Sequence, residues 1–475
     1  MSTVRKIAHN TLVQIGGKAL TAVLVLFGFG VMTRYLGQEG FGFYTTVYAF
    51  LAIFGILVDL GLQMTTTQII SDPREDESRI MSNALTIRLI ASLLFLGIAP
   101  LVALALPYPT PVKLGIGLAA GGFIFASLTA TLTSLFQKRL VMYRVVAAEI
   151  VAKVLFVSAV LLAVRLDGGL AGIIAAVVLD SFVTFCLLAY FARRYTMLRP
   201  AFEWSVWKKI LATTWPIGLT IALNLIYFKG DIVIMSLLRS QPEVGIYGAP
   251  YKFLEALINI AYLFLGLILP LLAAAVAAND QTKLKKVVQS TFEVLVAVSV
   301  PLVVGGLFVG TPLMILIAGP AFAVSGELMK ILLIAAAAIC CAGLFGYAVV
   351  ALKAQRRMIK FYALNAAVSI VGYIYLINRY SYWGAAWMTV ATELFMLGSA
   401  AWVVWRTTGF RPNLTVALKA LLASAVMALG LTLMRGWPVL ISVAAGALIY
   451  VAALYRLGGI DRRLVREMIS VKRKA

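Results

Sequence analysis

Long apolar stretches follow one another along almost the whole chain. A helix needs about 20 apolar residues to cross a bilayer, and fourteen windows meet that requirement. They are 12–33, 41–63, 83–107, 113–136, 146–165, 169–191, 210–238, 245–278, 287–310, 313–351, 358–377, 381–405, 413–434 and 437–457. Because 313–351 is too long for one helix, we place its span at 326–351. The sequence predicts an all-α polytopic membrane protein of about fourteen transmembrane helices.

The composition agrees with a membrane class and argues against an enzyme. The 475 residues are 62% hydrophobic and 13% charged, whereas soluble domains are about 45–50% apolar and about 25% charged. No loop between the windows is longer than about twenty residues, which leaves no room for a soluble catalytic domain. The chain also lacks the nucleotide-binding GxxxxGK[ST] motif and has one histidine, His9. We therefore expect no enzyme activity, no metal site and no cofactor.

The net charge of +22 follows the membrane topology rather than a nucleic-acid surface. Basic residues gather in alternate loops, which is the positive-inside pattern and predicts cytoplasmic N- and C-termini in a cytoplasmic (inner) membrane. The basic side holds Arg5, Lys6, Arg74, Arg79, Lys138, Arg139, Arg144, Arg193, Arg194, Arg199, Lys208, Lys209, Lys283, Lys285, Lys286, Lys353, Arg356, Arg357, Lys360, Arg406, Arg411 and the tail from Arg456 to Lys474. The opposite loops hold mainly Arg34, Lys113, Arg165, Arg239, Arg379 and Arg435. We expect no nucleic-acid partner.

An internal repeat divides the chain. Residues 31–51 align with 234–254 at a constant offset of 203 positions. The identical pairs are Met32/Met235, Gln38/Gln241, Gly42/Gly245, Tyr44/Tyr247, Tyr48/Tyr251, Phe50/Phe253 and Leu51/Leu254. Because an even number of spans separates the copies, the repeat predicts two parallel six-helix lobes, an arrangement typical of transporters. The predicted parts are an N-terminal lobe at 1–191, a cytoplasmic linker at 192–209, a C-terminal lobe at 210–405, and two further helices with a basic tail at 406–475.

Charged residues inside the apolar windows are the candidate functional residues, because a charge at mid-bilayer costs at least about 2.5 kcal/mol. Asp180 and Glu393 occupy matching places in the two lobes and are candidates for coupling to a proton or sodium ion. Each carboxylate could instead satisfy a helix–helix contact. Glu149 and Lys153 are spaced i, i+4, which favours either an ion pair on one helix face or a functional role.

The other candidates are mainly basic. Lys18 and Arg88 have no obvious partner in the sequence, and cations in a central cavity can hold phosphate oxygens. Together with Arg34, Lys153 and Lys252 they form a candidate cationic substrate cavity, and Glu149 and Glu255 join Asp180 and Glu393 as ion-coupling candidates.

Three further features concern local contacts. Lys229 and Asp231 lie near a span end, where snorkelling to the interface accounts for their charge. Asp59 heads an Asp-Leu-Gly-Leu segment and is expected to cap or pair locally. The acidic stretch 71–78 is either a solvated turn or a latch against basic loops.

The segment Thr33-Arg-Tyr-Leu-Gly-Gln-Glu-Gly-Phe-Gly-Phe-Tyr44, with Lys6 and Asn10 ahead of it, resembles the opening of the oligosaccharide flippase family. The segment Asp231…Val244-Gly-Ile-Tyr247…Lys252-Phe-Leu-Glu255 is similar to that family's second-lobe start. The family includes O-antigen and exopolysaccharide flippases and shares a superfamily with multidrug extruders and the lipid II flippase. The resemblance implies a translocase that moves undecaprenyl-pyrophosphate-linked oligosaccharide from the cytoplasmic to the outer leaflet by alternating access. The candidate carboxylates inside the spans would couple this cycle to an ion gradient. Its implied partners are membrane lipids and the polysaccharide polymerase and chain-length machinery.

Two other functions remain open on sequence alone. A multidrug or metabolite antiporter would share the architecture, although a cationic cavity opposes cationic drugs. A membrane-embedded glycan polymerase or glycosyltransferase is disfavoured by the short loops.

Overall fold

The computed structural model describes residues 3–197 and 199–459, with the side chains at 3–13, 15, 216–217 and 219–228 left aside. The predicted contributions of Lys6, His9 and Asn10, and of the basic tail beyond 459, lie outside the described side chains and residues. Within the described ranges the secondary structure is helical and contains no strand. The all-α fold class is confirmed.

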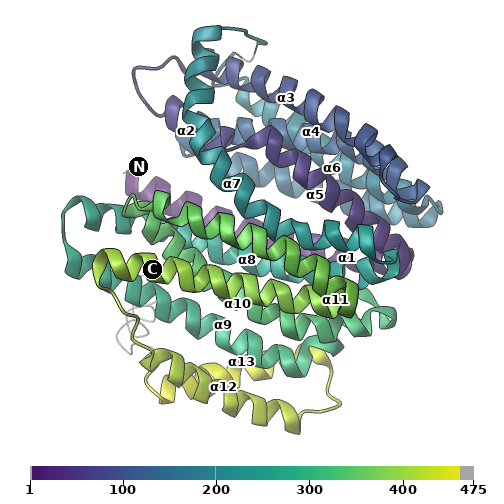
Figure 1. The fold of residues 1–475 in the computed structure, drawn as a ribbon, viewed down its shortest axis with the longest axis vertical. Coiled ribbons are helices and arrows are strands. Elements are labelled where there is room, and N and C mark those ends of the chain that lie inside the picture. The colour runs from purple at the N-terminus through teal and green to yellow at the C-terminus, as the bar shows by residue number, and fades with distance from the viewer. Residues whose placement is uncertain (1–2, 198, 460–475) are drawn as a thin grey trace. The chain divides into compact units, whose positions relative to one another are not determined.

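The helices follow one another with short connections (Figure 1). They are α1 (Thr3–Asp59), α2 (Leu62–Ile70), α3 (Glu77–Ala105), α4 (Thr110–Arg139), α5 (Tyr143–Arg165), α6 (Gly169–Ala192), α7 (Trp204–Leu238), α8 (Gln241–Ala277), α9 (Gln281–Ala318), the 3₁₀ turn η1 (Pro320–Phe322), α10 (Ala323–Ala351), α11 (Gln355–Thr408), α12 (Thr415–Leu433) and α13 (Val439–Arg456). In the described part of the chain, eleven of the helical segments are long and apolar enough to cross a membrane.

Two of the helices each join two predicted windows. In α1 the chain departs from helical geometry at Gly37, with φ 63° and ψ −171°, a conformation that is essentially restricted to glycine. This break falls between windows 12–33 and 41–63. In α11 the break is at Ser381, with φ 52°, where windows 358–377 and 381–405 meet. The count of fourteen spans stays a prediction.

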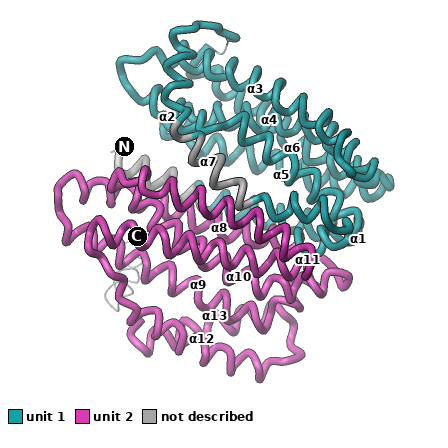
Figure 2. Tube along the Cα trace, viewed as in Figure 1, with its two compact units in different colours: residues 1–248 teal, residues 249–475 magenta. Residues whose placement is uncertain are grey.

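The chain forms two compact units, residues 1–248 and 249–475, coloured separately in Figure 2. This division falls within α8, whereas the predicted lobe boundary lies at 192–209. The difference arises because α7 packs against α1, α2 and α3 and so is counted with the first unit. The lobe boundaries were inferred from the sequence repeat and not from packing, so the division into two six-helix lobes stays a prediction.

The first unit is built around α1 and α4. Helix α1 packs against α3, α4, α5, α6 and α7, and α4 lies between α3 and α6. One apolar cluster includes Leu62, Met81, Phe136, Leu188 and Ile210, which come from five different helices and are all fully or almost fully buried. Burial of this kind fixes how the helices pack, while the lipid-facing residues remain exposed and apolar.

The second unit is built around α9, which packs against α10, α12 and α13, while α10 also packs against α11. The C-terminal helices are attached through a small cluster that includes Met427, Leu431 and Tyr450. The Tyr450 hydroxyl donates a hydrogen bond of 2.6 Å to the carbonyl oxygen of Ala297 on α9. This bond satisfies a polar group at the tip of an aromatic ring that is otherwise packed against apolar neighbours.

The two copies of the repeat contact each other within the first unit. A Cβ atom on Gly42 would lie 1.8 Å from the carbonyl oxygen of Gln241, and one on Gly245 would lie 2.0 Å from that of Gln38. Thr46 Oγ1 also donates a hydrogen bond of 2.8 Å to Gln241 Oε1. Since Gly42 aligns with Gly245 and Gln38 with Gln241, the two contacts are reciprocal. Glycine at both positions lets α1 and the start of α8 approach backbone to backbone.

Candidate functional site

Two ion pairs connect α5 to its neighbours inside the first unit. Lys18 Nζ on α1 lies 2.6 Å from Glu149 Oε2, and Lys153 Nζ lies 2.6 Å from Asp180 Oδ2 on α6. The expected pair between Glu149 and Lys153 on one helix face is therefore wrong. Because α1 and α6 both pack against α5, each charge reaches an opposite charge on a neighbouring helix.

The two pairs differ in their exposure. The side chains of Lys18 and Glu149 are 44% and 24% exposed, whereas those of Lys153 and Asp180 are 26% and 13% exposed. Asp180 Oδ1 is buried and has no hydrogen-bond partner among the described residues. The Lys153 ammonium also lies 5.4 Å from the centre of the Phe156 ring, a distance typical of cation–π contact. The four residues together form a polar patch on otherwise apolar helices. The pair of Lys18 and Glu149 is the more exposed part of this patch, and the pair of Lys153 and Asp180 is the more buried part.

Arg88 holds the break between α1 and α2. Its side chain is 1% exposed, with Nη1 2.5 Å from Asp59 Oδ1 and with Nε donating to Thr131 Oγ1 at 2.9 Å. The other Asp59 oxygen accepts from the Gly61 backbone at 3.3 Å, so the expected local role of Asp59 is confirmed. Leu60 and Gly61 both have positive φ, 39° and 86°. Arg88 therefore stabilises this turn from the interior and is not displayed on a surface.

The remaining candidates lie elsewhere. Arg34 is exposed on α1, three residues before the break at Gly37. Lys252 donates a hydrogen bond of 3.2 Å to Glu255 on the same helix, and both side chains are about one-third exposed. Glu393 is 4% exposed on α11. Lys252, Glu255 and Glu393 belong to the second unit, whereas the two ion pairs of α5 belong to the first.

A buried contact of Asp231 was not expected from the sequence. Asp231 is fully buried, and one of its oxygens accepts a hydrogen bond of 2.8 Å from the Tyr247 hydroxyl. The interpretation that Asp231 snorkels to the interface is therefore wrong. Tyr247 belongs to the repeat, and its counterpart Tyr44 stacks on Phe41 at 5.5 Å instead. The signal available in the sequence was a repeated tyrosine with a carboxylate sixteen residues before it in only one copy.

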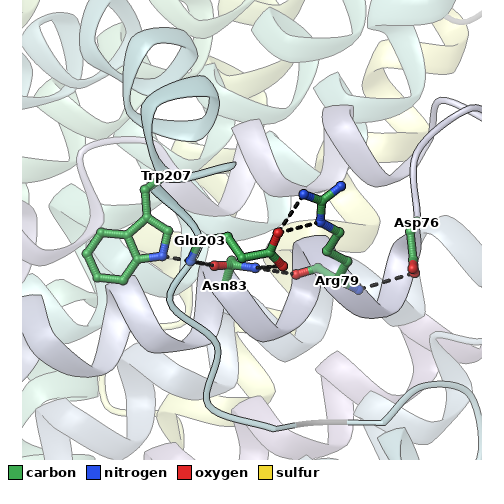
Figure 3. Close-up of polar contacts among 5 residues, drawn as sticks. All are labelled: Asp76, Arg79, Asn83, Glu203 and Trp207. Carbon is green, nitrogen blue, oxygen red and sulfur yellow. Dashed lines mark hydrogen bonds and ion pairs between the residues drawn. The ribbon is translucent and has the colours of Figure 1, made fainter. Parts of the chain in front are cut away.

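The connector between α6 and α7 is fastened to α3 by a network of polar contacts (Figure 3). Arg79 Nη2 lies 2.5 Å from Glu203 Oε2. Asn83 Oδ1 accepts hydrogen bonds from the Glu203 backbone at 2.9 Å and from Trp207 Nε1 at 3.0 Å. The hydrogen bond from Arg79 holds the pKa of the Glu203 carboxyl below its ordinary value. The predicted linker is thus attached to the first unit along part of its length.

The acidic stretch 71–78 forms ion pairs with basic residues of α4 and α7, as the latch interpretation predicts. Glu77 lies 2.5 Å from Lys138 and 2.6 Å from Arg139 at the end of α4, and Glu75 pairs with Lys209 at the start of α7. Asp76 accepts hydrogen bonds from the backbone of Ser78 and Arg79 and so caps α3. These contacts join the ends of α3, α4 and α7, and a purely solvated turn does not describe them.

Long apolar helices with ion pairs between them define a multi-pass membrane protein. A model of the family described as "Polysaccharide biosynthesis protein" matches residues 7–276, which is more than half of the chain. The chain belongs to this family. No curated protein matches the sequence closely enough to be compared with it.

Solved structures share the fold at low sequence identity. The lipid II flippase MurJ in an inward closed conformation matches with a TM-score of 0.77 and 13% identity, over 96% of this chain and 99% of that one. An inward-facing multidrug resistance MATE transporter of the MOP superfamily matches with a TM-score of 0.65 and 14% identity, over 90% and 100%. A MOP superfamily transporter from Pyrococcus furiosus, whose binding pocket is described as having reverse polarity, matches at 0.57 and 14%, over 83% and 96%.

Proposed function

We propose that this protein is a flippase that moves undecaprenyl-pyrophosphate-linked oligosaccharide from the cytoplasmic to the outer leaflet of the inner membrane. The observation that carries the proposal is that Lys18 and Lys153 pair with carboxylates on neighbouring apolar helices of a chain in the polysaccharide biosynthesis protein family. A fold shared with a lipid II flippase supports it. The cytoplasmic placement of both termini and O-antigen or exopolysaccharide units as cargo belong to the same proposal.

The two ion pairs supply a way to bind and release a pyrophosphate. Glu149 and Asp180 neutralise the lysines, which lowers the cost of keeping the cations among apolar helices. An incoming pyrophosphate offers stronger, charge-assisted acceptors and displaces the carboxylates from the lysines. The freed carboxylates then carry uncompensated negative charge, which favours the binding of a proton or a sodium ion. Binding of the anionic substrate and uptake of a proton or sodium ion are coupled in this way.

Alternating access follows from the repeat. Two parallel six-helix lobes that rock against each other would expose the substrate first to one side and then to the other. In this account Arg88 positions the break between α1 and α2, and the contacts of the acidic stretch 71–78 hold the inner ends of α3, α4 and α7 together. We propose that Arg34, Lys252, Glu255 and Glu393 serve the same transport cycle, and that polysaccharide polymerase and chain-length machinery act on its product.

Binding of undecaprenyl pyrophosphate to the purified protein in detergent tests the site. We expect Lys18→Gln and Lys153→Gln each to weaken binding about tenfold, the loss of one charge-assisted hydrogen bond. Lys330→Gln is the matched control, since Lys330 also pairs with a carboxylate, Glu327, on α10. Equal affinity in all three variants would remove both lysines from the substrate site.

The coupling step has a separate test. With transport assayed across an imposed pH or sodium gradient, Asp180→Asn and Glu393→Gln should each reduce the dependence of the rate on the gradient. An unchanged dependence in both variants would rule out ion coupling through these carboxylates. It would leave the substrate assignment intact.

A further inference from the structure

The two ends of α11 come together and carry a group of cations stacked on aromatic rings. Phe361, near the start of α11, lies 5.6 Å from the Trp402 ring near its end. Arg357 Nη1 donates a hydrogen bond of 3.1 Å to Thr407 Oγ1, which joins the same two ends. The break at Ser381 lets one continuous helical segment fold back in this way. We call Lys360, Trp402, Trp405, Arg406 and Arg411 the α11 basic cluster.

The cations of the cluster lie over indole rings. Lys360 Nζ is 5.6 Å from the centre of the Trp402 ring, and the Arg406 guanidinium is 5.5 Å from it. Arg406 also lies 5.4 Å from the Trp405 ring, on which Arg411 is placed at 5.1 Å. Two cations therefore lie within 5.6 Å of the centre of the Trp402 ring. Such stacking holds long side chains in place and leaves their N–H groups available for an anion.

No carboxylate of the described chain neutralises this cluster. Residues 328–392 and 394–460 contain no aspartate or glutamate. None of Lys360, Arg406 and Arg411 forms an ion pair within the part of the chain that the structure describes, and all three are exposed. The positive-inside pattern explains why cations are present at this end of α11. It does not explain why they converge on the indole rings of Trp402 and Trp405.

An apolar cavity opens on the same two halves of α11. Its volume is about 250 Å³, and its lining includes Leu364, Val368, Ala391 and Phe395, with Asn365 and Thr392 as its polar members. Phe361 connects the two features, because it contacts Trp402 in the cluster and lies 6.4 Å from Phe395 in the cavity wall. From Lys360, Leu364 and Val368 lie one and two turns further along the helix, about 6 and 12 Å deeper. The cations at the end of α11 suit an anionic headgroup, and the apolar cavity next to them suits an acyl chain of the same lipid.

We propose that the α11 basic cluster and the cavity beside it form a binding site for an anionic phospholipid. The phosphodiester contacts Lys360, Arg406 and Arg411, and one acyl chain lies along Phe361 and Phe395 into the cavity. Trp402 sits where the headgroup meets the chain, the depth that indole rings favour. This site is separate from Lys18 and Lys153 and does not depend on the proposed transport function.

Quenching of tryptophan fluorescence by brominated phosphatidylglycerol in detergent tests the site. The emission of Trp402 is obtained as the difference between the full-length protein and its Trp402→Phe variant. We expect half-maximal quenching of this component at a lower mole fraction of brominated phosphatidylglycerol than of brominated phosphatidylcholine. Millimolar inorganic phosphate should not reverse the quenching, since a lipid is bound by its chain as well as its charge.

Variants identify the cations involved. Lys360→Gln and Arg406→Gln should each raise the mole fraction needed by about fivefold, and the double variant by about thirtyfold. Arg379→Gln is the matched control, because Arg379 also stacks on a tyrosine, Tyr380, close to the α11 break. An unchanged response in the single and double variants would overturn the proposal. Equal weakening by Arg379→Gln, equal affinity for the zwitterionic lipid or reversal by phosphate alone would overturn it as well.

Discussion

Gly42 and Gly245 meet backbone to backbone although 203 residues separate them. A Cβ on Gly245 would lie 3.0 Å from the Gly42 nitrogen, in addition to its contact with Gln38. Thr45 and Gly248, which are also aligned in the repeat, contact each other through the Thr45 side chain, with a Cβ on Gly248 2.5 Å from Thr45 Cγ2. Aligned positions that touch one another lie close to a local axis of symmetry. The repeat is therefore visible in the packing of the first unit as well as in the sequence.

Alanine at either glycine should destabilise the protein. Because the new methyl group would overlap a backbone oxygen that cannot rotate away, the helices must separate. Overpacking of this kind costs about 1–3 kcal/mol or more, so Gly42→Ala and Gly245→Ala should each lower the Tm in detergent by several degrees. Gly121→Ala on α4 is the control, since nothing lies within 4 Å of its Cβ position. Equal Tm values for the three variants would contradict the close approach.

The sequence predicts most of this fold, because hydropathy alone identifies spans and a shared Gly/Tyr frame identifies the repeat. It also predicts the local hydrogen bond of Asp59, which accepts from the Gly61 backbone, but it does not predict the ion pair of Asp59 with Arg88. The sequence does not predict which charged residues pair between different helices. Glu149 and Lys153 are four residues apart and suit an intrahelical pair, but the packing of α1 and α6 on α5 gives each a nearer partner. Such pairs depend on the rotation of each helix about its axis, which an all-round apolar helix does not encode.

The contact of Asp231 with Tyr247 was also not predictable from the sequence. Its distance from a window edge suggested an interfacial charge, yet the turn at 239–240 returns Tyr247 to it. Depth in the membrane can be read from the sequence to within a few residues, whereas the long-range hydrogen bond that buries a charge cannot. The roles of Lys18, Lys153 and the other candidates remain predictions for the same reason.

The pair between Lys153 and Asp180 should behave as a unit in stability. Removing one partner leaves an uncompensated, largely buried charge, whereas removing both leaves none. Lys153→Ala should therefore cost about 1–3 kcal/mol, and Asp180→Asn added to it should restore most of that loss. A double-mutant cycle on Tm in detergent measures the coupling. Additive losses would show that the two side chains do not interact in the folded protein.

The connector should become mobile when Asn83 is removed. Asn83→Ala leaves the Glu203 backbone N–H and the Trp207 indole N–H without their acceptor. We expect hydrogen exchange of the amides of residues 199 and 201–203 to speed up about tenfold because one to two hydrogen bonds are lost. Asn413→Ala is the control, because Asn413 makes comparable turn contacts between α11 and α12. Unaltered exchange at 199–203 in Asn83→Ala would show that Asn83 does not anchor the connector to α3.

Acid should loosen the same connector. The pKa of Glu203 lies below its ordinary value of 4.5 because the Arg79 hydrogen bond favours the carboxylate. A carboxyl with a lowered pKa stabilises the attached state above the ordinary pKa, and this contribution is lost as the pH falls through the lowered one. Exchange at 199–203, corrected for the intrinsic rate, should thus rise below about pH 4.5 in the natural protein. In Glu203→Gln the pH dependence should be absent, and its persistence would assign the effect to another group.

Proteoliposomes that contain the purified protein test whether it moves a lipid-linked oligosaccharide across a bilayer. Undecaprenyl-pyrophosphate-linked oligosaccharide is loaded in both leaflets, the outer pool is trimmed by an external glycosidase, and further trimming reports arrival from the inner leaflet. We predict continued trimming with the natural protein, reduced rates with Lys18→Gln and Lys153→Gln, and the natural rate with Lys330→Gln. Trimming that stops at the outer pool, together with transport of a cationic dye by the same vesicles, would contradict the account and favour a multidrug antiporter.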